Sequence, residues 1–362
     1  MGKKHTYFDY SLLFVIFFLM AFGLLMLYSA SYSNASVQFL DGAYFLKNQL
    51  KAMILGTAGM VIMIFFPYKW LEKLSFLIYL SSFALCVAVI FIGTDHNGSK
   101  RWLEIGPIQF QPSEAAKIAM IIFVAAIIAK IPKQMGKITS LLKIIALVLP
   151  VFAVIAYQNL STAIIVIGIP AVMMFVASPK YMQFVVIGLA GLSGIAFFVL
   201  TADYRGDRFS VWLHPENYDK GYQTLQGLYA IGSGGLFGKG LGNSIQTNFL
   251  PEAENDMIFS IICEQLGIFG AIALILLFVF MLWRFMTIAN NAKDLFASML
   301  VVGIMAHIAI QVILNIAVVT NSIPNTGVTL PFVSYGGTSI LFLMAEMGIA
   351  LGVSRQIRIE GE

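Results

Sequence analysis

Ten long apolar runs constrain this 362-residue chain more than any other feature of its sequence. Each is close to the roughly 20 residues that an α-helix needs to cross the hydrocarbon core of a bilayer. Only 11% of the residues are charged, against roughly 25% in ordinary soluble domains. The sequence therefore predicts an all-α polytopic membrane protein with ten transmembrane helices. The runs cover residues 10–31, 52–66, 74–92, 115–131, 142–157, 161–177, 184–201, 257–283, 295–320 and 339–353.

The basic residues indicate how these helices are oriented. An even number of spans places both termini on one side of the membrane, and 13 of the 22 lysines and arginines fall on that side. Eight fall on the other side and Lys117 lies within a span. Because cytoplasmic loops carry the excess of basic residues, we expect a multi-pass protein of the cytoplasmic membrane with both termini cytoplasmic. The first run, which follows Lys3 and Lys4, is interpreted as a span and not as a signal peptide, since nine more spans follow.

No change of composition marks a domain boundary, so the sequence predicts a single membrane domain over residues 1–362. One long extracytoplasmic connection, at about residues 202–256, separates the seventh and eighth spans, and long connections of this kind are often functional. The net charge of +4 is too small to indicate binding to nucleic acid. Cys86 and Cys263 both lie in apolar runs and show no metal-ligand spacing. We therefore predict no metal site and no cofactor, with a divalent cation as the open alternative.

The long connection carries cations and glycines. Arg205 and Arg208 flank Asp207, and the stretch "FSVWLHP" that follows predicts a short interfacial helix. Six glycines then surround Lys239. Glycine-rich loops can bring backbone N–H groups onto phosphate oxygens, but this one lacks the lysine-serine pair of a nucleotide-binding loop. A flexible surface turn is the alternative interpretation.

Polar residues also occur within the spans. Glu114 lies in the first turn of the fourth span and Lys117 follows on the same helix face, so the two are predicted to pair inside an outward-facing cavity. The alternative is that Lys117 only extends its ammonium group toward the interface. His307, Gln311 and Asn315 form one stripe of the ninth span, and Glu346 lies in the tenth. We interpret these four as interhelical packing groups outside the site.

Three stretches resemble the SEDS family (shape, elongation, division and sporulation), whose members include FtsW and RodA. They are "RWLEIGPIQFQPSEAAKIA" at 101–119, the segment 221–267 with "GYQTLQGLYAIGSGGLFGKGLGNS" and "LPEAENDMIFSIICEQLG", and "NTGVTLPFVSYGGTS" at 325–339. The resemblance covers almost the whole chain. One departure is "YQNLSTA", where no proline stands between Gln158 and Asn159, which leaves open whether the chain bends at the sixth span.

The resemblance implies a GT-C-like membrane glycosyltransferase that polymerises lipid II into peptidoglycan strands at the outer face of the cytoplasmic membrane. A class B penicillin-binding protein, other division or elongation complex proteins and membrane lipids are the partners that it implies. The motifs look more like the division branch (FtsW and SpoVE) than the elongation branch. Two alternatives stay open: a lipid II flippase or transporter, and a non-catalytic scaffold of the division complex.

The resemblance also selects Asp256 as the catalytic base, because it matches the family's essential aspartate. Forming a glycosidic bond requires a base to take the proton of the acceptor hydroxyl, and a helix N-terminus is expected to help keep this carboxylate ionised. Glu252 and Glu254 are predicted to be solvated loop charges. Glu264, eight residues further on, is predicted to lie too deep to share the task.

Cations are needed to stabilise the leaving diphosphate. The resemblance supports Glu114 and Lys117 as functionally important. We infer from their position alone that Arg101, Arg205, Arg208 and Lys239 bind the substrate.

Overall fold

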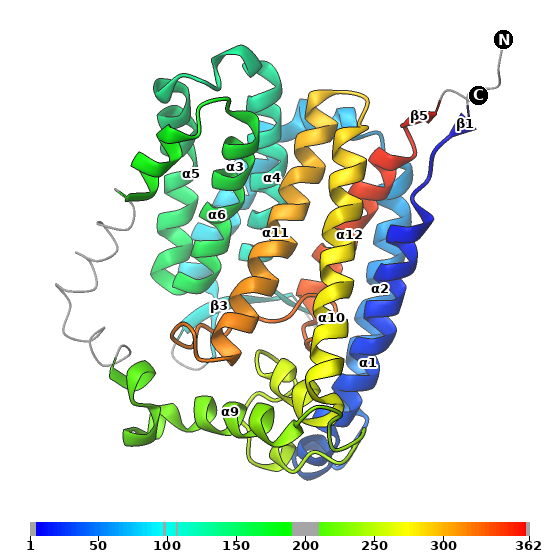
Figure 1. Ribbon diagram of the computed structural model, residues 1–362. Coiled ribbons are helices and arrows are strands. Elements are labelled where there is room, and N and C mark those ends of the chain that lie inside the picture. Colours follow the sequence, from blue (N-terminus) through cyan, green and yellow to red (C-terminus); the bar gives the residue numbers. More distant parts are fainter. Residues whose placement is uncertain (1–4, 97–98, 106–107, 190–209, 360–362) are drawn as a thin grey trace.

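The structure is a computed structural model that describes residues 5–96, 99–105, 108–189 and 210–359 (Figure 1). Within this part of the chain, nine helices are long and apolar enough to cross a membrane. Each coincides with one of the predicted runs, so the all-α multi-pass membrane fold is confirmed. The seventh expected span, 184–201, falls mostly on residues 190–209, outside the described part. The nine helices are α1 (Tyr10–Phe39), α2 (Tyr44–Phe65), α3 (Tyr68–Ile92), α4 (Pro112–Lys130), α5 (Ile138–Gln158), α6 (Leu160–Ala177), α10 (Ile258–Asn290), α11 (Leu295–Val319) and α12 (Gly337–Ser354).

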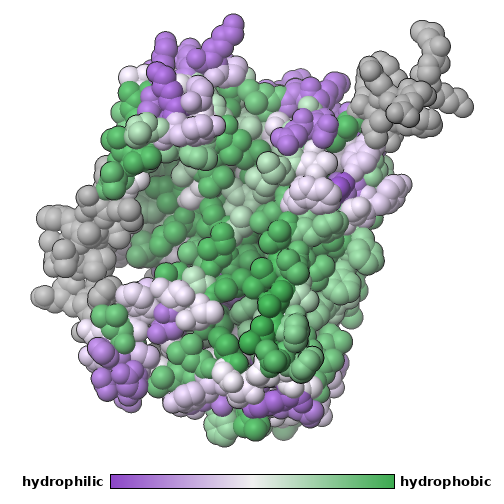
Figure 2. All heavy atoms as spheres, viewed as in Figure 1, coloured by the Kyte–Doolittle hydropathy of each residue, from purple (hydrophilic) through white to green (hydrophobic). Residues whose placement is uncertain are grey.

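The surface divides into an apolar band and two polar ends. Figure 2 shows hydrophobic residues over the middle of the helix bundle and hydrophilic residues gathered at both ends. Large apolar side chains such as Phe14, Leu77 and Ile313 are more than half exposed on this band. An apolar exterior of this kind is stable only in contact with lipid, which agrees with the run lengths.

The two ends of the chain meet at one end of the bundle. Strand β1 (His5–Thr6) pairs antiparallel with β5 (Arg358–Ile359). Beside this pair, Asp9 caps α1 by accepting a hydrogen bond from the Leu12 backbone N–H at 2.9 Å. The same carboxylate binds Arg284 near the end of α10, with an N–O distance of 2.7 Å. The first and last described residues therefore lie on the same side of the protein, in agreement with an even number of spans (Figure 1).

The opposite end carries the connecting elements. Helix α9 (Tyr222–Gly234) runs across this end of the bundle (Figure 1). Between α3 and α4 lies a three-stranded antiparallel sheet of β2 (Thr94–His96), β3 (Ser99–Ile105) and β4 (Ile108–Phe110), which was not predicted from the sequence. The described 3₁₀ turns are η1 (Pro132–Gln134) between α4 and α5, and η2 (Pro215–Asn217), η3 (Asp219–Gly221) and η4 (Gln246–Asn248) in the long connection.

The bend between α5 and α6 is present without a proline. Asn159 separates the two helices in extended backbone geometry. Its side-chain oxygen accepts hydrogen bonds from the backbone N–H groups of Ser161 at 3.0 Å and Thr162 at 3.3 Å. Asparagine is a preferred N-cap residue because it satisfies these otherwise unpaired donors. The departure from the family pattern therefore leaves the break between the helices intact.

Helix α10 is interrupted at Gly267, where the glycine-rich segment 235–242 docks onto it. Gly267 has a φ of 68°, and a Cβ there would come within 2.4 Å of the Leu236 carbonyl oxygen. The backbone N–H of Ile268, freed by the interruption, donates to the Gly235 carbonyl at 3.0 Å. Only glycine combines this backbone geometry with so close an approach. The segment is thus fixed to the helix and is not a flexible turn.

Candidate active site

Asp256 lies in the turn that leads into α10, and only 6% of it is exposed. Its carboxylate oxygen Oδ1 accepts a hydrogen bond from the Gln223 amide of α9 at 3.3 Å. Its backbone carbonyl accepts a hydrogen bond from Asn315 Nδ2 of α11 at 2.8 Å. Helices α9, α10 and α11 therefore jointly position this side chain.

The two amides are themselves held in place. Asn325 Nδ2 donates to Gln223 Oε1 at 2.9 Å, which leaves the Gln223 NH₂ group to face Asp256. Asn315 Nδ2 also donates to the Val328 carbonyl at 2.7 Å. Asn325 and Val328 belong to the connection between α11 and α12, which carries part of the family signature. This segment therefore packs around Asp256.

Burial, together with the nearby charges of Glu252 and Glu254, raises the pKa of the Asp256 carboxyl from 3.8 to about 7. This differs from the expectation that the helix N-terminus helps keep the group ionised, because burial removes the carboxylate from water and favours its neutral form. A general base works best when its pKa is near the operating pH. The environment therefore suits Asp256 for that role.

The prediction of two solvated glutamates holds for one of them. Glu252 is exposed, but Glu254 is 6% exposed, and its carboxylate accepts a hydrogen bond from Asn34 of α1 at 3.3 Å. The Tyr335 backbone N–H donates to the Glu254 carbonyl at 2.8 Å. Glu254 was expected in water because it lies in a loop, but the α11–α12 connection covers that loop.

Glu114 and Lys117 form the expected ion pair, with an N–O distance of 2.9 Å. Both are buried, with 7% and 2% exposed, so Lys117 does not reach the surrounding water. Lys117 Nζ is also 3.5 Å from the Gln311 side-chain oxygen of α11. Gln311 lies one helical turn, about 6 Å, from Asn315, which holds the Asp256 carbonyl. Gln311 and Asn315, one turn apart on α11, thus connect the ion pair to the turn that carries Asp256.

The polar stripe of α11 is the part of this site that sequence reasoning left out. His307 Nδ1 lies 2.8 Å from the Glu346 carboxylate of α12, and His307 Nε2 lies 2.8 Å from Gln311 Oε1. Gln311 Nε2 donates to the Thr329 carbonyl at 3.0 Å. The stripe therefore joins the Glu114–Lys117 pair to the α11–α12 connection beside Asp256. Its spacing was visible in the sequence, but which groups it contacts was not.

The described ion pair of Lys239 is with a carboxylate other than Asp256. Its ammonium group forms an ion pair with Glu264 of α10 at 2.7 Å. Glu264 is fully buried and also accepts hydrogen bonds from the Ser244 hydroxyl and from the backbone N–H groups of Ile245 at 3.2 Å and Gln246 at 3.3 Å. Glu264 thus stays apart from Asp256, as expected, and anchors the glycine-rich segment. The assignment of Lys239 to the substrate stays a prediction.

The described residues include only one of the three arginines of the predicted site. Arg101 lies half-buried on β3. Arg205 and Arg208 fall outside the described residues. Among the described residues, no group of three or more His, Cys, Asp or Glu side chains could hold a metal ion, and the alternative of a divalent cation stays untested.

Comparison with known proteins shows which family has this arrangement. Residues 10–359 match the family model described as cell cycle protein, that of FtsW, RodA and SpoVE. The chain belongs to this family. It is 40% identical to stage V sporulation protein E of Bacillus subtilis over 99% of this chain and 100% of that protein. It is 34% identical to the probable peptidoglycan glycosyltransferase FtsW of Saccharophagus degradans, over 98% and 94% of the two chains.

Solved structures of the FtsW, RodA and SpoVE family have the same fold. A chain from a peptidoglycan synthase complex that coordinates polymerization and crosslinking matches with a TM-score of 0.81 and 25% identity, over 96% of this chain and 98% of that one. Rod shape determining protein RodA of Thermus thermophilus matches with a TM-score of 0.71 and 26% identity, over 96% and 97%.

Proposed function

We propose that this chain is a peptidoglycan glycosyltransferase that polymerises lipid II into glycan strands at the outer face of the cytoplasmic membrane. The observation that carries the proposal is the carboxyl of Asp256, buried between α9, α10 and the α11–α12 connection with a pKa of about 7. Relatives named peptidoglycan glycosyltransferase support the activity. The domain organisation, one membrane domain over residues 1–362, stays a prediction.

In the proposed reaction, Asp256 accepts the proton of the acceptor sugar hydroxyl. That oxygen forms a bond to the anomeric carbon of the donor, and the bond from this carbon to the lipid diphosphate breaks. The diphosphate leaves with the electron pair, and its negative charge requires a cation.

Lys117 is the cation that we assign to the diphosphate. An ammonium group has three N–H donors, and the described contacts of Lys117 engage Glu114 and Gln311. One donor is left for a phosphate oxygen. Because the group is buried, its attraction for an anion is screened less than at the surface.

The proposed orientation places both termini in the cytoplasm and Asp256 outside. The excess of basic residues on the side of the termini supports it. The pairing of β1 with β5 brings the two ends of the described chain together. Asp9, beside this pair, binds Arg284 near the end of α10, whereas Asp256 precedes the start of the same helix.

We further propose a class B penicillin-binding protein as partner, together with other division complex proteins. The likeness to a chain of a peptidoglycan synthase complex supports a crosslinking partner. The 40% identity to a sporulation protein, together with the matches to FtsW, supports the division branch.

The decisive experiment uses the purified chain, lipid II and no other glycosyltransferase. A ladder of glycan strands on a gel is the expected result. If lipid II instead crosses the bilayer of proteoliposomes without forming polymer, the chain is a transporter. If neither occurs with or without the cognate transpeptidase, the chain is a scaffold and the proposal is wrong.

A further inference from the structure

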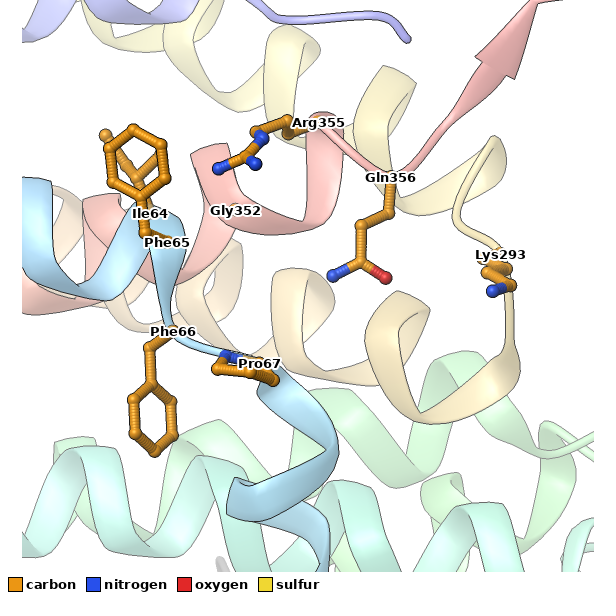
Figure 3. Close-up of a pocket in the computed structure, with 8 residues that line it drawn as sticks. All are labelled: Ile64, Phe65, Phe66, Pro67, Lys293, Gly352, Arg355 and Gln356. Atoms are coloured by element: carbon orange, nitrogen blue, oxygen red, sulfur yellow. The ribbon is translucent and has the colours of Figure 1, made fainter. Parts of the chain in front are cut away.

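A cavity lies at the other end of the helix bundle from Asp256. Asp256 precedes α10 and Lys293 follows it, so the two are separated by 33 helical residues, or about 50 Å. The cavity has a volume of about 390 Å³ and is formed where the end of α2, the α2–α3 connection, the end of α12 and the α10–α11 connection meet (Figure 3). Lys293, Arg355 and Gln356 supply its polar lining, and Phe65 and Phe66 its apolar edge. The proposed glycosyltransferase chemistry uses none of these residues.

The cavity carries two positive charges that no carboxylate in the described part of the chain neutralises. Lys69 and Arg284, at the same end of the bundle, each bind a carboxylate. Lys293 and Arg355 are exposed and form no ion pair with any carboxylate among the described residues. The Arg355 guanidinium lies 4.6 Å from the centre of the Phe65 ring. Two cations beside one cavity favour an anionic ligand.

The apolar edge of the cavity continues onto the lipid-facing surface. Phe65 is 66% exposed and Phe66 38%, and Ile62, one turn earlier on α2, is 65% exposed. In Figure 3 the Gln356 side chain points toward the space between the elements, while the Phe66 ring points away from it. A ligand with an anionic group and a hydrocarbon portion could therefore contact the two cations and the apolar edge at the same time.

We propose that this cavity binds the headgroup phosphate of an anionic membrane phospholipid, with Lys293 and Arg355 facing the phosphate. The acyl chains would lie along Phe65, Phe66 and Ile62 in the adjacent bilayer leaflet. Basic pockets between helices at the cytoplasmic surface suit such headgroups, because that leaflet is rich in anionic lipid. Zwitterionic lipid is disfavoured because its own cation offsets the phosphate charge. Free phosphate would gain nothing from the apolar edge.

The test counts lipids retained by the purified full-length protein in native mass spectrometry, with phosphatidylglycerol or phosphatidylcholine added. Wild type should retain phosphatidylglycerol preferentially, and the double variant Lys293→Gln, Arg355→Gln should bind it about 25-fold more weakly, at about fivefold for each charge. The matched control is Lys130→Gln, Lys133→Gln, two exposed lysines at the same end of the bundle. The control should retain phosphatidylglycerol as wild type does.

Three outcomes would overturn the proposal. Unchanged phosphatidylglycerol binding in the double variant would show that the cavity is not the site. An equal loss in the control variant would indicate general attraction of charge. Displacement of the lipid by an equal concentration of inorganic phosphate would assign the cavity to a free anion. Since no step measures polymerisation, the result is independent of the proposed catalytic activity.

Discussion

Lys239 Nζ lies 2.7 Å from the Glu264 carboxylate, and this ion pair fastens the glycine-rich segment to α10, eight residues beyond Asp256. The segment and the helix also exchange backbone hydrogen bonds, such as that from Lys239 N–H to the Glu264 carbonyl at 2.9 Å. The glycine-rich segment is thereby a structural support for α10, while the binding of substrate by Lys239 stays a prediction.

Glu264→Gln should destabilise the protein. The amide removes the charge that Lys239 neutralises and gives two N–H donors to a site that supplies donors already, so we expect a loss of about 1 to 3 kcal/mol. The midpoint of thermal unfolding in detergent measures it. The control is Asp41→Asn, which removes the exposed Lys47–Asp41 ion pair and should cost no more than about 1 kcal/mol. Equal shifts in the two variants would mean that Glu264 is not an anchor.

Asp256→Asn should nearly abolish glycan polymerisation while the protein still folds. The amide keeps the size of the side chain but cannot accept the acceptor proton, and general bases contribute about 10² to 10⁴-fold. The rate is measured with purified protein and lipid II. Glu252→Gln is the matched control, because Glu252 is exposed in the same turn, and it should keep most of the activity. Polymerisation by Asp256→Asn at the wild-type rate would refute the assignment of the base.

Polymerisation should depend on pH through the same carboxyl. With the pKa of Asp256 near 7, the ionised base is scarce below that pH, so the rate should rise about tenfold per unit well below 7 and level off above it. The free energy of unfolding should change with pH in the opposite direction. The folded protein holds this proton more tightly than an unfolded chain with a pKa of 3.8, so stability falls as pH rises from about 4 to 7. Asp256→Asn should lack that fall, which unfolding midpoints at pH 5 and 8 would reveal.

Replacing either member of the Glu114–Lys117 pair alone should destabilise the protein. Glu114→Ala or Lys117→Ala leaves one buried charge without its partner, at a cost of about 3 to 5 kcal/mol, so yield and unfolding midpoint should both drop. The double variant Glu114→Gln, Lys117→Met buries no charge and should recover the fold but not polymerisation, because the cation for the diphosphate is gone. A wild-type rate in Lys117→Ala would exclude Lys117 from the site.

Cysteine labelling in intact cells tests the orientation. Asn217 and Gln134 are both exposed, at opposite ends of the bundle, and the native Cys86 and Cys263 are buried, which keeps background labelling low. Asn217→Cys should react with an impermeant maleimide and Gln134→Cys should not. The reverse pattern would move Asp256 to the cytoplasmic side and contradict the proposed substrate access.

The sequence alone determined the spans and the family. Whether a segment enters lipid depends on its own length and apolarity, so nine predicted runs coincide with helices although the α3–α4 sheet was missed. The Glu114–Lys117 pair was also predictable, because residues three apart on one helix are neighbours whatever surrounds them. Asp256 was chosen from the family motif, which is a property of the sequence.

Only the tertiary structure decided what surrounds these residues. Asp256 receives a pKa near 7 from burial under α9 and the α11–α12 connection, segments dozens of residues away in the chain. Glu254 is buried and Lys239 is bound to Glu264 for the same reason: their partners come from other helices. The α11 stripe showed that His307 and Gln311 share a helix face, but not that this face meets Lys117 and Glu346. Desolvation and pairing depend on contacts between distant segments, and a local pattern does not contain them.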